Sequence, residues 1–170
     1  DLRGLVGYDF NFTELGGFVL APFTGIGYRY VFDNQGGQTT SGANAYNRSS
    51  TYVYLPIGVT HRMKVNDTHK LETVFEYDYL IQGTQVSQLS QAASYLPNVT
   101  NQQTSGYGLR LSSMYQFDAW SVGPYVSYWN IQNSNTVTQT ITVNRVNYRL
   151  TAYEPANNTI EAGIKIAYSF

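Results

Sequence analysis

Three carboxylates lie on one parity of a single alternating stretch, and their spacing is the first sign of chemistry. Glu72, Glu76 and Asp78 fall within "LETVFEYDYL", where a period of two places residues of one parity on the same face of a strand. Such carboxylates can bind a cation or act as acid and base. A fourth acid and four bases occupy comparable positions in other stretches: Glu161, Arg29, Arg62, Arg110 and Lys165. We expect these residues to form a ladder of ion pairs, because isolated buried charges are costly.

His61 and His69 are the only histidines. A histidine paired with a carboxylate or a serine moves protons in hydrolases, and His69 could pair with Glu72 or Asp67. Both histidines flank the short turn "KVNDTH", however, and His61 shares the parity of the apolar Val59. We therefore expect no catalytic site and no enzyme.

Composition limits the remaining classes of function. The chain has 170 residues, a net charge of -1, 12% charged residues and no cysteine. This length suits a single domain over residues 1–170, and the charge gives no case for nucleic acid. Without cysteine there is neither a disulfide nor a thiolate metal site, and we expect no cofactor and no metal. No apolar run approaches the roughly 20 residues of a membrane-spanning helix.

Period-two alternation predicts an all-β chain. Strands are expected near 2–12, 17–32, 51–63, 69–81, 105–117, 120–131 and 158–170, with a further candidate at 139–153. One face of each strand is apolar, and the other mixes small residues with opposite charges. In 105–117, for example, Leu109 and Leu111 lie opposite Gly108 and Arg110. This pattern suits a narrow membrane barrel, since a charge on its lipid face costs roughly 2–4 kcal/mol at the midplane.

Aromatic residues gather toward both ends of these strands. One expected girdle contains Phe10, Phe12, Phe117, Trp120, Tyr168 and Phe170, and the other contains Tyr28, Tyr30, Phe32, Tyr77, Tyr79 and Tyr128. Such belts mark the two membrane interfaces of a barrel. Short turns alternate with long polar loops at 33–50, 82–104 and 132–157, as in barrels with short periplasmic turns and long external loops.

The end of the chain, "EAGIKIAYSF", resembles the C-terminal signal strand that the barrel-assembly machinery reads in bacterial outer-membrane proteins. The matching positions are Ala162, Ile164, Ile166, Tyr168 and Phe170. Wider stretches such as "LAPFTGIGYRYVFDN" and "YEPANNTIEAGIKIAYSF" resemble the porin-like outer-membrane β-barrel family of Gram-negative bacteria. The resemblance implies a transmembrane antiparallel up-and-down β-barrel in the bacterial outer membrane.

The number of strands admits two interpretations. With the C-terminus periplasmic, seven stretches cross the membrane, and 139–153 belongs to a hairpin extending the last external loop. An odd number of N-terminal strands is then missing, because single-chain bacterial barrels have even strand numbers, and the family resemblance implies three more strands and ten in all. The rival interpretation makes 139–153 a crossing and closes eight strands within this chain. We favour the incomplete barrel.

The expected function is that of a non-enzymatic, porin-like or structural barrel with a charged lumen and displayed polar loops. A narrow diffusion channel for small polar solutes is the first alternative. An outer-membrane hydrolase is a second, and it needs a histidine, a carboxylate or a serine to converge at the outer rim. A soluble lipocalin-like binder is disfavoured by the charged inner faces. The expected partners are outer-membrane lipid and the barrel-assembly machinery, with no nucleic acid, while the loops offer surfaces for an external partner or a neighbouring subunit.

Overall fold

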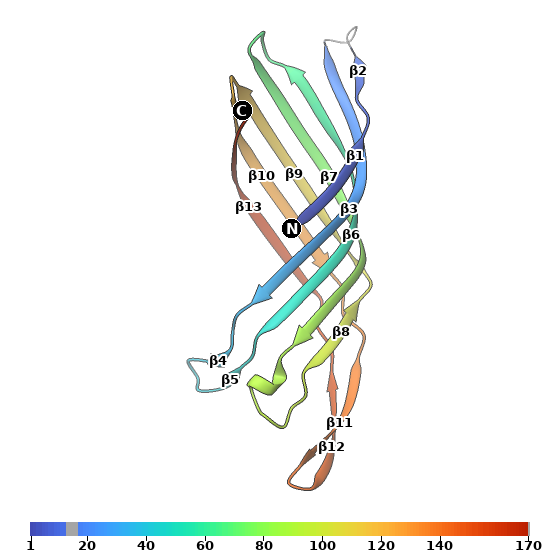
Figure 1. The fold of residues 1–170 in the computed structure, drawn as a ribbon, viewed down its shortest axis with the longest axis vertical. Coiled ribbons are helices and arrows are strands. Elements are labelled where there is room, and N and C mark those ends of the chain that lie inside the picture. Colours follow the sequence, from blue (N-terminus) through green and yellow to red (C-terminus); the bar gives the residue numbers. More distant parts are fainter. Residues whose placement is uncertain (13–16, 170) are drawn as a thin grey trace.

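A computed structural model describes residues 1–12 and 17–169, and in this part of the chain the fold is all-β and antiparallel, as predicted (Figure 1). The main sheet has nine strands, of which seven follow one another in the order β1-β3-β6-β7-β9-β10-β13. Their bounds are β1 Leu2–Gly7, β3 Phe18–Asp33, β6 Arg48–Lys64, β7 His69–Ser87, β9 Gly106–Phe117, β10 Trp120–Ile131 and β13 Asn157–Tyr168. The short strands β2 (Phe10–Phe12) and β8 (Val99–Gln103) pair with β3 and β7. No helix in the described residues has the length and apolar character of a membrane span.

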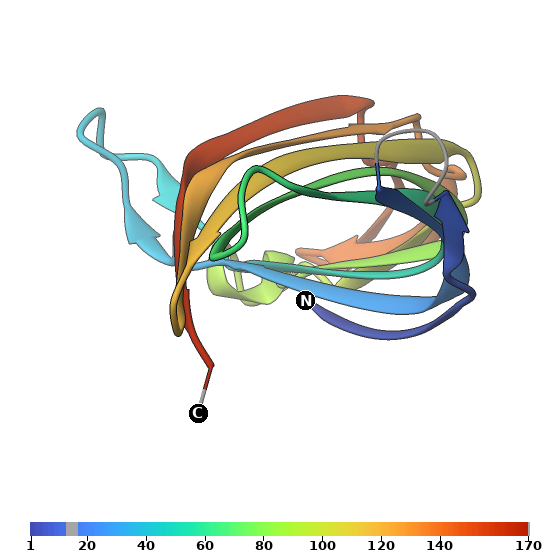
Figure 2. The same cartoon turned by 90° about the horizontal axis from the view of Figure 1, so that it is seen from above.

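The main sheet curls but stays open among the described residues. Viewed from above, β3 and β13 lie on opposite walls of the curled sheet (Figure 2), yet β1 and β13 are unpaired edges. All six neighbouring pairs along the seven-strand path are antiparallel. As a result, β1 and β13 run in the same direction. Direct pairing of these two edges would therefore be parallel.

The two faces of this sheet differ as alternation predicted. The convex face carries exposed apolar side chains on every long strand, among them Ile26, Ile57, Phe75, Leu111, Val126 and Ile164. The concave face carries the charged side chains and a buried aromatic cluster. β-Branched and aromatic residues favour such strands, and tight turns end them: Asp118 adopts a positive φ of 51° between β9 and β10.

Residues 139–153 do not form a crossing strand. Most of them lie in β11 (Val137–Val143) and β12 (Val146–Ala152), which pair only with each other as a separate sheet. Asn144 and Arg145 join them with φ values of 51° and 66°, the backbone of a tight hairpin turn. The hairpin projects from the end of the sheet that carries the long connections, called here the loop end (Figure 1). The predicted hairpin extension is thus confirmed, and the eight-strand interpretation is wrong.

The prediction of two long loops, at 33–50 and 82–104, is partly wrong, because both ranges contain strand residues. Instead of ending at Ile81, β7 continues to Ser87, and β8 pairs with this extension. The predicted loop 82–104 therefore shrinks to the connection that contains a 3-10 turn at Leu89–Gln91. In the predicted loop 33–50, β6 already begins at Arg48, and β4 (Gly37–Gln38) pairs with β5 (Asn44–Ala45).

Candidate functional site

The concave face of the curled sheet holds a network of ion pairs, and its centre is Glu76 on β7. The Glu76 side chain is 1% exposed. Its carboxylate accepts hydrogen bonds from Arg3 Nη1 at 2.6 and 2.8 Å and lies 3.2 Å from Arg110 Nε. Because β1 and β7 are not neighbours in the sheet, the Arg3–Glu76 pair spans the concave face. Two guanidinium groups thus compensate one buried carboxylate.

Arg110 on β9 is shared among several acceptors. Its Nε donates to Asp78 Oδ2 at 2.7 Å, and Nη2 donates to Asp1 Oδ2 at 2.7 Å and to the Tyr54 hydroxyl at 3.0 Å. Tyr54 in turn donates to Asp1 Oδ1 at 2.6 Å. The beginning of the chain is thereby fixed to strands on the opposite side of the concave face.

A second contact across the concave face joins Arg29 on β3 to Glu161 on β13. Arg29 Nη2 donates to Glu161 Oε1 at 2.8 Å, and Ser127 Oγ lies 3.5 Å from Glu161 Oε2. In the sheet four strands lie between β3 and β13. This ion pair therefore bridges the two walls of the curled sheet.

The remaining charged residues from the sequence lie toward the short-turn end, the end of the sheet opposite the loop end. Arg62 donates to Glu72 Oε2 at 3.0 Å and to Asp9 Oδ2 at 2.9 Å, in a more exposed setting than Glu76. Lys165 has no carboxylate within 4.0 Å in the part of the chain that is described, and its Nζ lies 5.1 Å from the ring centroid of Tyr125. Of the eight expected residues, seven join ion pairs and Lys165 makes a cation–π contact.

Sequence reasoning missed Asp1, Arg3 and Asp9 in this network. Arg3 shares its parity with Gly7 in β1, a signal that could have placed it on the concave face. It also missed a group at the loop end, where Arg48 lies 3.0 Å from Asp33 and 3.6 Å from Glu154. Burial raises the pKa of Glu154, against the effects of Arg48 and a hydrogen bond to Gln85.

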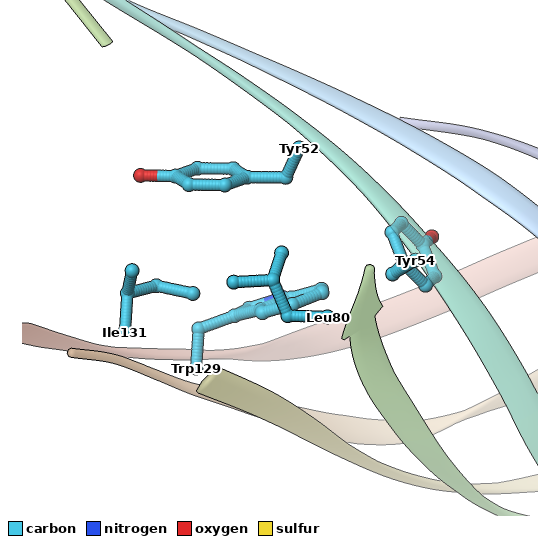
Figure 3. Packing of buried hydrophobic residues seen from close by; sticks show 5 residues of the cluster. All are labelled: Tyr52, Tyr54, Leu80, Trp129 and Ile131. Atoms are coloured by element: carbon cyan, nitrogen blue, oxygen red, sulfur yellow. The ribbon is translucent and has the colours of Figure 1, made fainter. Parts of the chain in front are cut away.

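A buried cluster of large side chains fills the middle of the concave face (Figure 3). It contains Tyr52, Tyr54, Leu80, Trp129 and Ile131. Trp129 makes an edge contact with Tyr54 at 5.1 Å and a stacked contact with Tyr52 at 6.3 Å. The guanidinium groups of Arg29 and Arg110 lie 5.3 and 5.7 Å from the Trp129 ring. Charged and aromatic residues together close this level of the concave face.

Glycines on neighbouring strands give these rings their space. A Cβ atom at Gly27 would meet the Tyr54 ring at 2.1 Å, and one at Gly108 would meet Asp78 Oδ2 at 2.8 Å and Trp129 at 3.0 Å. Packing this close leaves no room for a methyl group. The sequence predicts these glycines on the face opposite the apolar one, and there bulky side chains from neighbouring strands pack against them.

Two cavities remain on the concave face. The larger, of about 1050 Å³, is lined by Arg3, Arg62, Glu72, Glu76, Arg110 and Lys165 among others. The smaller, of about 400 Å³, lies toward the loop end and includes Arg29, Arg48, Trp129 and Glu154. Glu161 lines both cavities. Arg110 lines only the larger of these cavities and Arg29 and Trp129 line only the smaller, so the packed cluster around Trp129 borders both.

Among the described residues, neither histidine contacts a carboxylate or a serine side chain. His69 Nδ1 lies 2.7 Å from the Tyr115 hydroxyl and 3.3 Å from Asn66 Nδ2, and the His61 ring lies 5.4 Å from Phe18. Within residues 1–12 and 17–169 there is no group of three or more histidine or acidic residues placed to hold a metal.

Some members of the two expected aromatic groups contact each other or a neighbouring ring. At the short-turn end Trp120 contacts Tyr168 at 4.9 Å, and Phe12 stacks on Phe18 at 5.1 Å. Toward the loop end Tyr107 lies 6.0 Å from Tyr77 and 6.1 Å from Tyr128. The expected assembly signal lies on the edge strand β13, where Ile164, Ile166 and Tyr168 are exposed. Phe170 lies outside the described residues.

No protein-family model matches this chain, and a search of curated proteins gives no match.

Proposed function

We propose that this chain forms most of the wall of an outer-membrane β-barrel, with a porin-like or structural, non-enzymatic role. The observation that carries the proposal is the distribution of polarity over the curled sheet. Exposed apolar side chains cover its convex face, while ion pairs and buried polar groups fill its concave face. A soluble barrel has the opposite arrangement, with an apolar interior and a polar exterior.

The convex face of β13 illustrates why lipid is the solvent we propose. Ile160, Ile164 and Ile166 are 70%, 74% and 69% exposed, and similar rows continue on the neighbouring strands. Contiguous apolar surface of this extent is rare on soluble monomers. Contact with lipid would remove the free-energy cost of exposing this apolar surface to water. The two aromatic groups would then lie at the two membrane–water interfaces.

Membrane insertion also requires closure of the sheet. Hydrocarbon offers no partner for the free N–H and C=O groups of a strand edge, so a spanning sheet must pair both edges. Since β1 and β13 run in the same direction, antiparallel closure takes an odd number of additional strands. We propose that such strands complete the barrel, in line with the even strand numbers of single-chain bacterial barrels.

A pair of adjacent cysteine substitutions tests the proposal. The chain has no native cysteine, so Ile164→Cys and Lys165→Cys each introduce a unique thiol. Strand alternation places the first on the convex face and the second on the concave face. In lipid vesicles, a water-soluble maleimide is expected to label position 165 and to leave position 164 unlabelled, because lipid covers the convex face.

Unfolded protein labelled at equal rates at both positions serves as the control. If position 164 reacts as fast as position 165 in folded, vesicle-bound protein, the convex face is in water and the membrane proposal is wrong.

A narrow diffusion channel is a second candidate, and the cavity of about 1050 Å³ favours it. The cavity carries charges of both signs, which suits small polar solutes. The closed level around Trp129 opposes free passage. Steady conductance of the wild-type protein in planar bilayers would support this candidate, and its absence would leave the structural role.

A further inference from the structure

The two cavities of the concave face meet at a single side chain. Glu161 lines both, whereas Arg29 lines the cavity at the loop end alone and Arg110 lines the larger cavity alone. Arg29 donates to Glu161 at 2.8 Å across the face. The Arg29–Glu161 ion pair therefore lies on the boundary between the two cavities.

The rest of this boundary is held more firmly than the ion pair. Asp78 and Glu76 are 0% and 1% exposed, and each contacts Arg110. Tyr54 is fixed by two hydrogen bonds and by the packing of its ring against Gly27. These groups would leave buried charges or clashes if they moved.

Glu161, by contrast, is free to change its position. Its side chain is 51% exposed, and its only other hydrogen bond in the described residues is the 3.5 Å contact with Ser127. An exposed ion pair of this kind is worth little free energy. Glu161 can thus leave Arg29 without disturbing the packed cluster.

We propose that the Arg29–Glu161 ion pair is a gate between the two cavities, and that its opening joins them into one passage for small polar solutes. Arg29 stays over the Trp129 ring when Glu161 leaves, because the cation–π contact at 5.3 Å holds it. This inference rests on the proposed barrel, since the passage leads across a membrane only when the sheet is closed and inserted.

Trp129 reports on this gate directly. The chain has two tryptophans, and Trp120 lies on the convex face near Tyr168. In a Trp120→Phe background, Trp129 is the only tryptophan. In detergent micelles, neutral acrylamide reaches Trp129 from the loop-end cavity that it lines when the gate is closed, and from both cavities when the gate is open. Time-resolved fluorescence separates collisional quenching from changes in the intrinsic lifetime.

Breaking the pair is expected to expose Trp129 to the quencher. Arg29→Gln and Glu161→Gln should each raise the bimolecular quenching constant severalfold, and the exchanged double variant Arg29→Glu with Glu161→Arg should return it toward the starting value. Glu72→Gln is the matched control, because it breaks an ion pair of the same face that borders the larger cavity alone.

Unchanged quenching in both single variants would overturn the gate, and so would a double variant that stays as accessible as the single ones. Glu161 is half exposed, so Glu161→Gln should fold even if Arg29→Gln does not, and circular dichroism checks this. The measurement needs no bilayer. A failed gate therefore leaves the cysteine labelling result intact, and a failed labelling test does not alter the quenching result.

Discussion

Glu76 illustrates how single residues hold the concave face together. It is buried between Arg3 and Arg110, so its charge stabilises two strands that are not adjacent in the sheet. Removing one partner of a buried ion pair leaves uncompensated charge, which costs far more than the loss of an exposed pair. Exposed Glu72 makes a comparable ion pair with Arg62, which allows a direct comparison.

Glu76→Gln is expected to lower the free energy of unfolding by about 3–5 kcal/mol, because it leaves Arg3 and Arg110 without their shared carboxylate. Glu72→Gln is expected to cost at most about 1 kcal/mol. Denaturant unfolding in detergent, followed by circular dichroism, measures both. Equal effects of the two variants would contradict the central role of Glu76.

Parity alone was enough to predict most of these residues. Arg29, Arg110 and Glu161 stand out in the sequence because each interrupts a face of small residues opposite an apolar face. Their partners across the sheet could not be predicted, since alternation says which face a residue lies on but not how the sheet curls. The role of Asp1 could not be predicted for the same reason, because Asp1 contacts Arg110 only where the curl brings the start of β1 close to β9.

At the scale of elements, an irregularity of the backbone explains where the prediction from the sequence is wrong. Val53 and Tyr54 are consecutive in β6, but they pair with Gln82 and Leu80 of β7. Ile81 is therefore an extra residue in β7. Such a bulge shifts the alternation by one position. Gly83, Gln85 and Ser87 thereby face inward, and the interrupted period explains why the strand was predicted to end at Ile81.

The β11–β12 hairpin is expected to be dispensable for the main sheet, because its strands pair only with each other. Replacing residues 139–150 by Asn-Gly keeps Thr138 and Thr151 opposite each other, as they are now, and supplies the residues that a two-residue hairpin turn favours. The shortened chain should show the same unfolding temperature in detergent as the parent. A large loss of stability would mean that this segment supports the sheet after all.

At the scale of the whole molecule, the main sheet has two unpaired edges, β1 and β13, among the described residues. An edge strand leaves about half of its amides without a partner, and all twelve residues of β13 have a neighbouring strand on one side only. The sequence predicted the odd number of strands through the direction of the last one. It could not predict the depth of the curl or the contacts that span it, because these depend on side chains far apart in the chain.

Hydrogen exchange tests the closure in the membrane-inserted protein. If additional strands pair with β13, all its amides should exchange slowly in lipid, including the alternate ones that do not face β10. NMR-detected exchange resolves this pattern, with β7, which is paired on both sides, as the internal reference. Fast exchange at every second amide of β13 would mean that the edge remains open to water.

The unequal lengths of the strands have a further consequence. β6 and β7 have 17 and 19 residues, whereas β10 and β13 have 12, and the surplus of β7 lies beyond Tyr79, toward the loop end. At about 3.3 Å per residue, the wall formed by β6 and β7 extends farther toward the loop end than the wall formed by β10 and β13. The rim of the main sheet at this end is therefore uneven, and the β11–β12 hairpin emerges from its shorter part, between β10 and the strand that carries Glu161 (Figure 1).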